Sequence, residues 1–160
     1  MSRSGELRGE NLVNALLTAS RALVAVAARS LADIEENVTL AQYRMLVVLG
    51  RHGELSLQQL AGELGVNPST AMRMVDRLTT AEAVNRRDNP DDRRGVLVCL
   101  TGTGLSILRR VTARRYREID RIVTAMLPRR RAEMVAALNA FAEAAGELDA
   151  QPDHASILGW

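Results

Sequence analysis

Hydroxyl and guanidinium side chains occur together between residues 69 and 77, at the spacing of one helix face. Thr70, Arg73 and Arg77 are separated by three and four positions, so in a helix they project from one side. Ser69 and Thr70 would occupy the first turn, where free backbone N–H groups favour a phosphate. Arginine is the side chain best suited to bidentate contact with guanine in the major groove of DNA. The pattern therefore indicates a helix that reads DNA, although an ordinary helical hairpin with a solvated polar face has the same pattern.

The neighbouring residues carry the start and stop signals of two short helices joined by a tight turn. Ser56 and Gln59 form a capping box, and Gly65 stands where a left-handed C-terminal cap is least costly. Asn67 is an N-cap residue, and Pro68 suits the first helical position. Each helix has an apolar face: Leu57, Leu60, Ala61 and Leu64 in the first, and Ala71, Val75 and Leu78 in the second. We therefore predict a helix-turn-helix and call its second helix the reading helix.

A β-hairpin is predicted directly after the reading helix. Residues 83–87 are partly extended in character, residues 89–95 are turn residues rich in charge, and residues 96–100 are a clear strand run. We call this hairpin the wing. An arginine at its tip suits the negative potential of a narrow minor groove. Asp92 can fix the guanidinium of Arg94 by a forked ion pair.

The run from Val38 to Gly104, about two fifths of the chain, resembles the MarR family of bacterial winged helix-turn-helix regulators. The most specific pieces are NPSTAMRMVDRL and the Asp92-x-Arg94 motif ahead of VLVCLT. The resemblance implies a dimer that binds palindromic operators and commonly responds to small phenolic or otherwise lipophilic ligands. We assign to DNA contact the residues Ser56, Asn67, Pro68, Ser69, Thr70, Arg73, Arg77, Asp92, Arg93 and Arg94.

One segment departs from the family pattern. The family usually has Gly-Leu-Val between the reading helix and the wing, and here the residues are Glu82, Ala83 and Val84. If the turn keeps a positive φ at Glu82, the non-glycine residue costs about 1 kcal/mol. Ala83 also lacks the large apolar side chain that would pack between wing and helix. The sequence therefore does not determine the angle between the wing and the reading helix.

Long amphipathic segments flank this unit. Residues 6–36 predict one helix whose apolar stripe is wider than a single packing partner requires, which favours a partner subunit over burial within one chain. Thr39 and Gln42 form a capping box for the next helix. Thr101 caps a helix that runs to about Met126. Leu40, Tyr43, Leu46 and Val47 would form the buried face of the helix capped by Thr39. The later helices carry apolar stripes: Leu105, Leu108, Thr112, Tyr116, Ile119, Val123 and Met126, and, after Pro128, Met134, Leu138, Phe141, Ala145 and Leu148.

The predicted fold class is mainly α with a small β-hairpin wing (α+β), a winged helix-turn-helix with long N- and C-terminal dimerisation helices. Residues 39–100 would form the DNA-binding lobe. Residues 1–38 and 101–160 would form a helical dimerisation region, with residues 149–160 as a tail that docks on the rest of the protein, the partner subunit being one candidate surface.

Composition limits the alternatives. The chain has 160 residues, 47% hydrophobic and only 2% aromatic, which predicts one compact unit with an aliphatic core. All 21 basic residues are arginine, which we attribute to coding bias. The stretch from Leu57 to Leu97 contains six arginines and six acidic residues, so binding cannot rest on a bulk basic field. We find no signal peptide and no uninterrupted apolar run long enough to span a membrane, so we expect a cytoplasmic protein without membrane contact.

No catalytic constellation is present in the sequence. His52 and His154 lack clustered partners at metal-ligand spacing, and no phosphate-binding glycine loop follows a strand. Cys99 in a predicted strand is more typical of a small hydrophobe than of a redox sensor. We therefore expect no enzyme activity, no cofactor and no metal.

The sequence thus predicts a DNA-binding transcriptional regulator. We expect a repressor that binds a palindromic operator on double-stranded DNA as a homodimer and is released by a small lipophilic or aromatic ligand. The alternative is a helical dimeric interaction protein of the same fold that has lost DNA binding, which the balanced charges and the altered turn at Glu82 favour.

Overall fold

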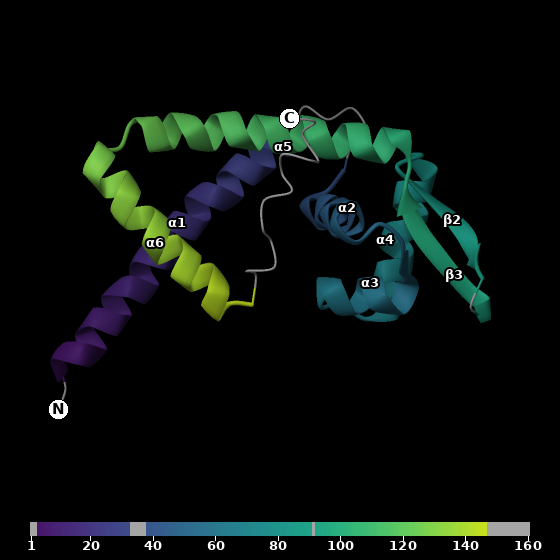
Figure 1. Cartoon of the computed structure of the whole chain (residues 1–160), viewed down its shortest axis with the longest axis horizontal. Coiled ribbons are helices and arrows are strands. Elements are labelled where there is room, and N and C mark those ends of the chain that lie inside the picture. The colour runs from purple at the N-terminus through teal and green to yellow at the C-terminus, as the bar shows by residue number, and fades with distance from the viewer. Residues whose placement is uncertain (1–2, 33–37, 91, 147–160) are drawn as a thin grey trace.

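The computed structural model describes residues 3–32, 38–90 and 92–146, with the backbone alone for residues 3–8 and 92–94. Within these residues the elements are α1 (Arg3–Ala32), α2 (Leu40–His52), β1 (Leu55–Ser56), α3 (Leu57–Leu64), α4 (Pro68–Thr80), β2 (Val84–Asn89), β3 (Asp92–Leu100), α5 (Gly102–Thr124) and α6 (Pro128–Ala144). α2, α3, α4 and the sheet gather around the first half of α5, and α1 and α6 lie at its second half (Figure 1). The mainly helical winged fold expected from the sequence is confirmed.

The capping signals place the helices of the lobe. Thr39 and Ser56 each form a complete capping box, with Gln42 and Gln59 respectively. Gly65 ends α3 in the left-handed conformation, with φ 65°. Asn67 caps α4 and Pro68 is its first residue. These four predictions are confirmed because a cap depends on residues only a few positions apart.

The sheet has three strands in the order β1-β3-β2, all antiparallel. Leu55 of β1 pairs with Val98 of β3, and Val98 also lies opposite Arg86 of β2. The wing is therefore anchored through β3 to the residue pair that precedes α3. β1 was not predicted, because two residues are too few to display the alternation of a strand.

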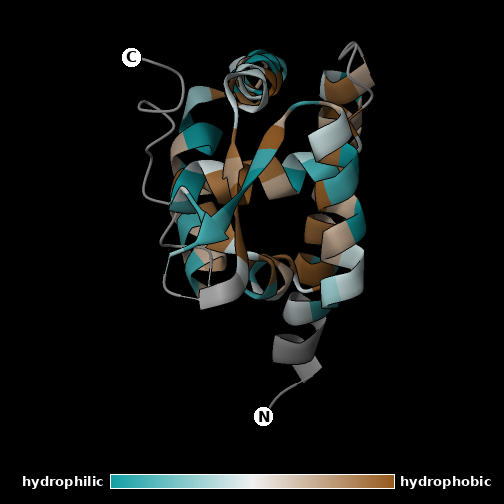
Figure 2. Ribbon diagram, turned by 90° about the vertical axis from the view of Figure 1, so that its right-hand side faces the viewer, coloured by the Kyte–Doolittle hydropathy of each residue, from teal (hydrophilic) through white to brown (hydrophobic). Residues whose placement is uncertain are grey.

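One aliphatic core holds the lobe together. It consists of Leu31, Val38, Tyr43, Met45, Leu46, Leu49, Leu55, Leu60, Ala61, Leu64, Ala71, Val75, Leu78, Ala83, Val84, Val98, Ile107, Leu108 and Val111. α5 thus contributes its first turns to the same core as the helix-turn-helix. Hydrophobic and hydrophilic residues alternate along the helices, as amphipathic helices require (Figure 2).

One predicted core residue was wrong, and the predicted apolar stripe of α5 is exposed at two positions. Leu40, Leu105 and Tyr116 are exposed, because α2 turns Gln42, Met45 and Leu49 inward and α5 turns Ile107 and Val111 inward. The elements that pack against a helix determine which side of a broad apolar stripe is buried. The periodicity of the sequence does not determine it. The Tyr43 hydroxyl still reaches the interior edge, where it lies 2.9 Å from the Thr112 hydroxyl.

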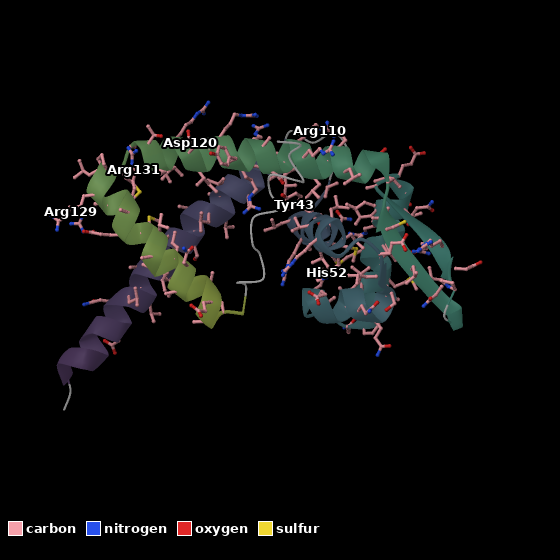
Figure 3. All side chains as sticks on the ribbon, in the orientation of Figure 1. Tyr43, His52, Arg110, Asp120, Arg129 and Arg131 are labelled. Atoms are coloured by element: carbon pink, nitrogen blue, oxygen red, sulfur yellow. The ribbon has the colours of Figure 1, made fainter. Side chains whose placement is uncertain are left out.

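The helices outside the lobe expose much apolar surface. α1 is buried only near its end, at Val26, Ala27, Ser30 and Leu31, and α6 has no buried residue in its described length. The large exposed side chains are Leu12, Val13, Leu17, Leu23 and Val24 on α1, and Met134, Val135, Leu138 and Phe141 on α6. Arg131 closes the end of α5 by donating from Nε to the Met126 carbonyl at 3.0 Å and from Nη2 to the Thr124 carbonyl at 2.7 Å (Figure 3).

α1 also differs from the expectation of no membrane-spanning segment. By length and composition alone, Gly9–Ala32 is long and apolar enough to cross a membrane. This segment is not an uninterrupted apolar run, because Arg21 and Arg29 lie within it. Arg29 forms an ion pair with Glu118 of α5 at 2.9 Å, which ties the end of α1 to the fold. Leu148 and the predicted tail at residues 149–160 lie outside the described residues.

Candidate nucleic-acid interface

The outer face of α4 carries the residues that the sequence assigns to base contact. Ala71, Val75 and Leu78 are fully buried, so the helix presents its opposite side to solvent. There Thr70, Arg73, Met74 and Arg77 line an open depression. Met74 was not predicted, because a single methionine next to the buried Val75 gives no signal of its own.

The first turn of α4 is held in one conformation by its cap. The Asn67 side-chain oxygen accepts hydrogen bonds from the Thr70 backbone N–H and from the Ser69 hydroxyl, both at 2.8 Å. Nη2 of Arg73 donates to the Thr70 hydroxyl at 3.3 Å, which holds the guanidinium over the same turn. Arg77 is exposed one turn further along. The arrangement places hydroxyl and guanidinium donors on one open helix face, which suits phosphate oxygens and guanine edges.

Ser56 lies apart from this group, at the junction of β1 and α3. Its hydroxyl accepts from the Gln59 backbone N–H at 3.3 Å, and its own N–H donates to the Gln59 side chain at 2.9 Å. Pro68 is exposed at the start of α4. The structure therefore gives Ser56 a clear capping role and leaves its contact with DNA a prediction.

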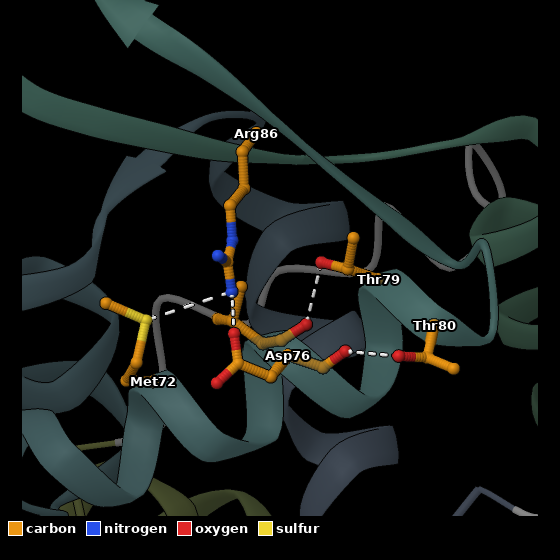
Figure 4. Close-up of polar contacts among 6 residues, drawn as sticks. Met72, Asp76, Thr79, Thr80 and Arg86 are labelled. Atoms are coloured by element: carbon orange, nitrogen blue, oxygen red, sulfur yellow. Dashed lines mark hydrogen bonds and ion pairs between the residues drawn. The ribbon is translucent and has the colours of Figure 1, made fainter.

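Two ion pairs change how the balanced charges of the lobe are distributed. Asp76 of α4 pairs with Arg86 of β2, and Glu54, just before β1, pairs with Arg87 (Figure 4 for the first pair). The acid nearest to the reading face is thus neutralised by a cation from the wing. Arg73 and Arg77 are in neither pair, so the equal count of charges does not make this face neutral.

The strands of the wing extend further towards its tip than predicted. β2 and β3 pair from Val84 and Leu100 to Asp88 and Val96, and the register then shifts so that Asn89 lies opposite Asp92. Arg93, Arg94 and Gly95 fall between the two registers, at the start of β3 and not in the turn itself. The side chains of Asp92, Arg93 and Arg94 lie outside the described part of the structure, so the ion pair between Asp92 and Arg94 stays a prediction.

The turn between the reading helix and the wing has the geometry that the sequence indicated. Glu82 has φ 54°, the single positive φ of a non-glycine residue in the described chain. Its carbonyl accepts a hydrogen bond from the Thr101 hydroxyl, and the Ala83 carbonyl accepts one from the Thr101 N–H at 3.1 Å. Ala83 is completely buried, and the start of α5 packs directly on its backbone. The backbone therefore replaces the large side chain that the family usually has here.

Replacing Glu82 with glycine is expected to raise the free energy of unfolding by about 0.5 kcal/mol. The left-handed conformation costs an L-residue about 1 kcal/mol or more, and the greater freedom of glycine in the unfolded chain offsets part of this gain. Urea unfolding at a fixed protein concentration measures the change. Glu82→Ala is the control, because it removes the charge and keeps the Cβ. An equal gain in both variants would assign the effect to charge and not to the backbone.

The described residues were also compared with the requirements of metal-binding and redox sites. They contain no group of three His, Cys, Asp or Glu side chains placed to hold a metal ion. Nε2 of His52 lies 3.6 Å from a carboxylate oxygen of Glu63, which joins α2 to α3. The thiol of Cys99 is half-buried and lies 3.8 Å from the Asn85 carbonyl, within the wing.

The chain is similar in sequence and structure to proteins of one family. The model of the MarR family matches residues 38–96. The crystal structure of RV1404 from Mycobacterium tuberculosis is 49% identical, with a TM-score of 0.79, over 86% of this chain and 94% of that one. The repressor MdtR from Bacillus subtilis is 36% identical over 70 residues, which are 44% of this chain and 45% of MdtR. A structure of NadR in complex with 4-hydroxyphenylacetate is 25% identical, with a TM-score of 0.64, over 82% of this chain and 89% of NadR.

The extent of these matches differs. The chain spans about half the length of most of the curated relatives it matches. The family model covers the helix-turn-helix and most of the wing, and the similarity to RV1404 extends over nearly the whole of that protein. Two relatives from Bacillus subtilis, YhbI and MdtR, are named as a helix-turn-helix transcriptional regulator and a helix-turn-helix transcriptional repressor. The winged fold, the open face of α4 and these similarities together show that the chain belongs to the MarR family of DNA-binding transcription regulators.

Proposed function

We propose that this protein is a repressor that binds a palindromic operator as a homodimer, with α4 of each subunit in the major groove. The observation that carries the proposal is the capped, open face of α4, where Thr70, Arg73 and Arg77 lie together. Arginine at the start of a reading helix suits guanine, and the wing suits the adjacent minor groove. Residues 39–100 would form the DNA-binding lobe, and the protein would act in the cytoplasm.

The proposed dimer uses α1, α5 and α6. Leu12 is 62% exposed, Val135 is 59% exposed and Phe141 is 53% exposed, which is costly for helices left in water. A second copy would cover these stripes and account for the apolar length of α1 without a membrane. Twofold symmetry would set the two reading helices about 34 Å apart, one turn of DNA.

Light scattering at micromolar concentration is expected to give the mass of two chains. The apolar stripes of α1 and α6 are the physical reason, because a monomer would leave them in contact with water. A monomer mass would contradict the dimer. Recovery of the protein only with membranes or detergent would assign Gly9–Ala32 to a lipid contact instead.

A small aromatic or lipophilic effector is proposed from the relatives and the composition. NadR was crystallised with 4-hydroxyphenylacetate, and the core of this chain is aliphatic. The effector would bind between the lobe and the dimer helices, apart from the depressions on α4 and at the start of α6. A ligand acts only through its differential affinity for the DNA-competent and incompetent arrangements.

A gel-shift assay with the DNA that flanks the protein's own gene tests the function. Specific retention of a promoter fragment, and its release by an aromatic acid that also raises the melting temperature, is the expected result. If every compound that binds leaves the DNA affinity unchanged, the regulatory part fails. Absence of any specific retention would favour the alternative, a dimeric interaction protein, which is motivated by the equal numbers of arginines and acids between Leu57 and Leu97 and by the non-glycine residue Glu82.

A further inference from the structure

Two adjacent arginines of β2 tie the wing to different parts of the lobe. Successive residues of a strand point to opposite faces of the sheet. Arg86 accordingly pairs with Asp76 on α4, and its Nη2 also lies 3.8 Å from the sulfur of Met72 (Figure 4). Arg87 pairs with Glu54, which precedes β1. One arginine thus links the wing to the reading helix, and the other links it to the base of the sheet.

The link through Arg86 starts from the middle of α4, on the flank beside the face that carries Thr70, Arg73 and Arg77. Asp76 stands three residues after Arg73 and one before Arg77. The α4 backbone around it is further tied by the Thr79 and Thr80 hydroxyls, which donate to the Val75 and Asp76 carbonyls at 2.8 and 3.1 Å. The covalent route between α4 and β2 passes through the turn at Glu82. The ion pair is therefore a second, non-covalent connection between the reading helix and the wing.

We propose that Arg86 is a positioning residue, which with Asp76 fixes the angle between the wing and the reading helix. Its guanidinium is directed at α4 and is engaged by Asp76 and Met72, so it is held away from the role of a phosphate contact. With the angle fixed, the wing reaches DNA when α4 is seated in its groove. This inference rests on the proposed function, because it assumes that α4 and the wing bind one DNA site.

The first test measures affinity for the promoter fragment with Arg86→Ala, Asp76→Ala and the double variant. Each is expected to weaken binding by about tenfold, the size expected when a dimer loses two exposed ion pairs. The double variant should be no weaker than the single ones, since all three remove the same connection. Arg86→Lys should recover part of the affinity. Asp88→Ala, which removes an exposed acid of β2, is the control and should leave binding unchanged or slightly tighter.

A direct phosphate contact by Arg86 predicts a different pattern. Arg86→Ala would then weaken binding, Asp76→Ala would tighten it by removing negative charge near DNA, and the double variant would resemble the wild type. Tighter binding by Asp76→Ala would therefore overturn the proposal. The melting temperature of every variant is also measured. DNA affinities are compared only between variants whose thermal unfolding transition matches that of the wild type.

The second test needs no DNA. Spin labels at positions 69 and 88, with Cys99→Ser and an excess of unlabelled chain, report the distance from the start of α4 to the wing. Arg86→Ala is expected to broaden the distance distribution, and Arg87→Ala is expected to broaden it less. An unchanged distribution in Arg86→Ala would overturn the proposal. If the wild type fails to bind promoter DNA, the proposed function fails, and this measurement still decides whether Arg86 positions the wing.

Discussion

Gly104→Ala is expected to lower the free energy of unfolding by about 3 kcal/mol, the upper part of the range for overpacking a rigid interior. A Cβ on Gly104 would lie 2.0 Å from the Ala83 carbonyl oxygen and 3.0 Å from its carbon. The obstacle is backbone, so no side-chain rotation relieves the clash. α5 would have to move away from the turn that joins the reading helix to the wing.

Urea unfolding at equal protomer concentration measures this effect, because the stability of a dimer depends on concentration. Gly102→Ala is the matched control, two residues earlier in the same helix, where a Cβ would meet nothing within 4 Å. Its stability should equal or slightly exceed that of the wild type, since alanine is the better helix former. Equal losses in the two variants would show that the contact with Ala83 is not the cause of the loss.

Arg73→Ala is expected to cost about 1–3 kcal/mol of operator binding per half-site and to relax discrimination at one base position. The reason is the place of Arg73 in the first half of α4, with its guanidinium held by Thr70 on the open face. Binding titrations against the promoter fragment and against single-base variants of it measure both effects. Unchanged specificity in Arg73→Ala would show that another residue reads that base.

The wing supplies the comparison for this result. Arg94→Ala is expected to weaken binding evenly across sequences and to make the salt dependence shallower by about one phosphate equivalent per subunit. Asp92→Ala should have a similar but smaller effect if it orients Arg94, whereas a bulk-electrostatic account predicts tighter binding. Titrations at two salt concentrations separate these accounts, and tighter binding by Asp92→Ala would refute the orienting role.

The sequence by itself determined the elements that depend on close neighbours. The capping pairs at Thr39 and Ser56, the left-handed Gly65 and the start of α4 at Asn67 were all confirmed. Each is set by hydrogen bonds or backbone preferences within four residues. The positive φ of Glu82 was considered only through the resemblance to the MarR family, on the condition that the turn is kept, and the structure shows it.

Contacts between elements were decided only by the tertiary structure. The exposure of Leu40 and Leu105, the pairing of β1 and the burial of Gly104 against Ala83 depend on how α5 lies across the lobe. The sequence counted Arg86 and Asp76 as two opposite charges, and folding of the hairpin over α4 made them a pair. Their ten-residue separation has no fixed period, so local spacing carries no signal of the contact. The pair forms because β2 runs back alongside α4 after the turn at Glu82. The packing of the whole core fixes the direction of β2.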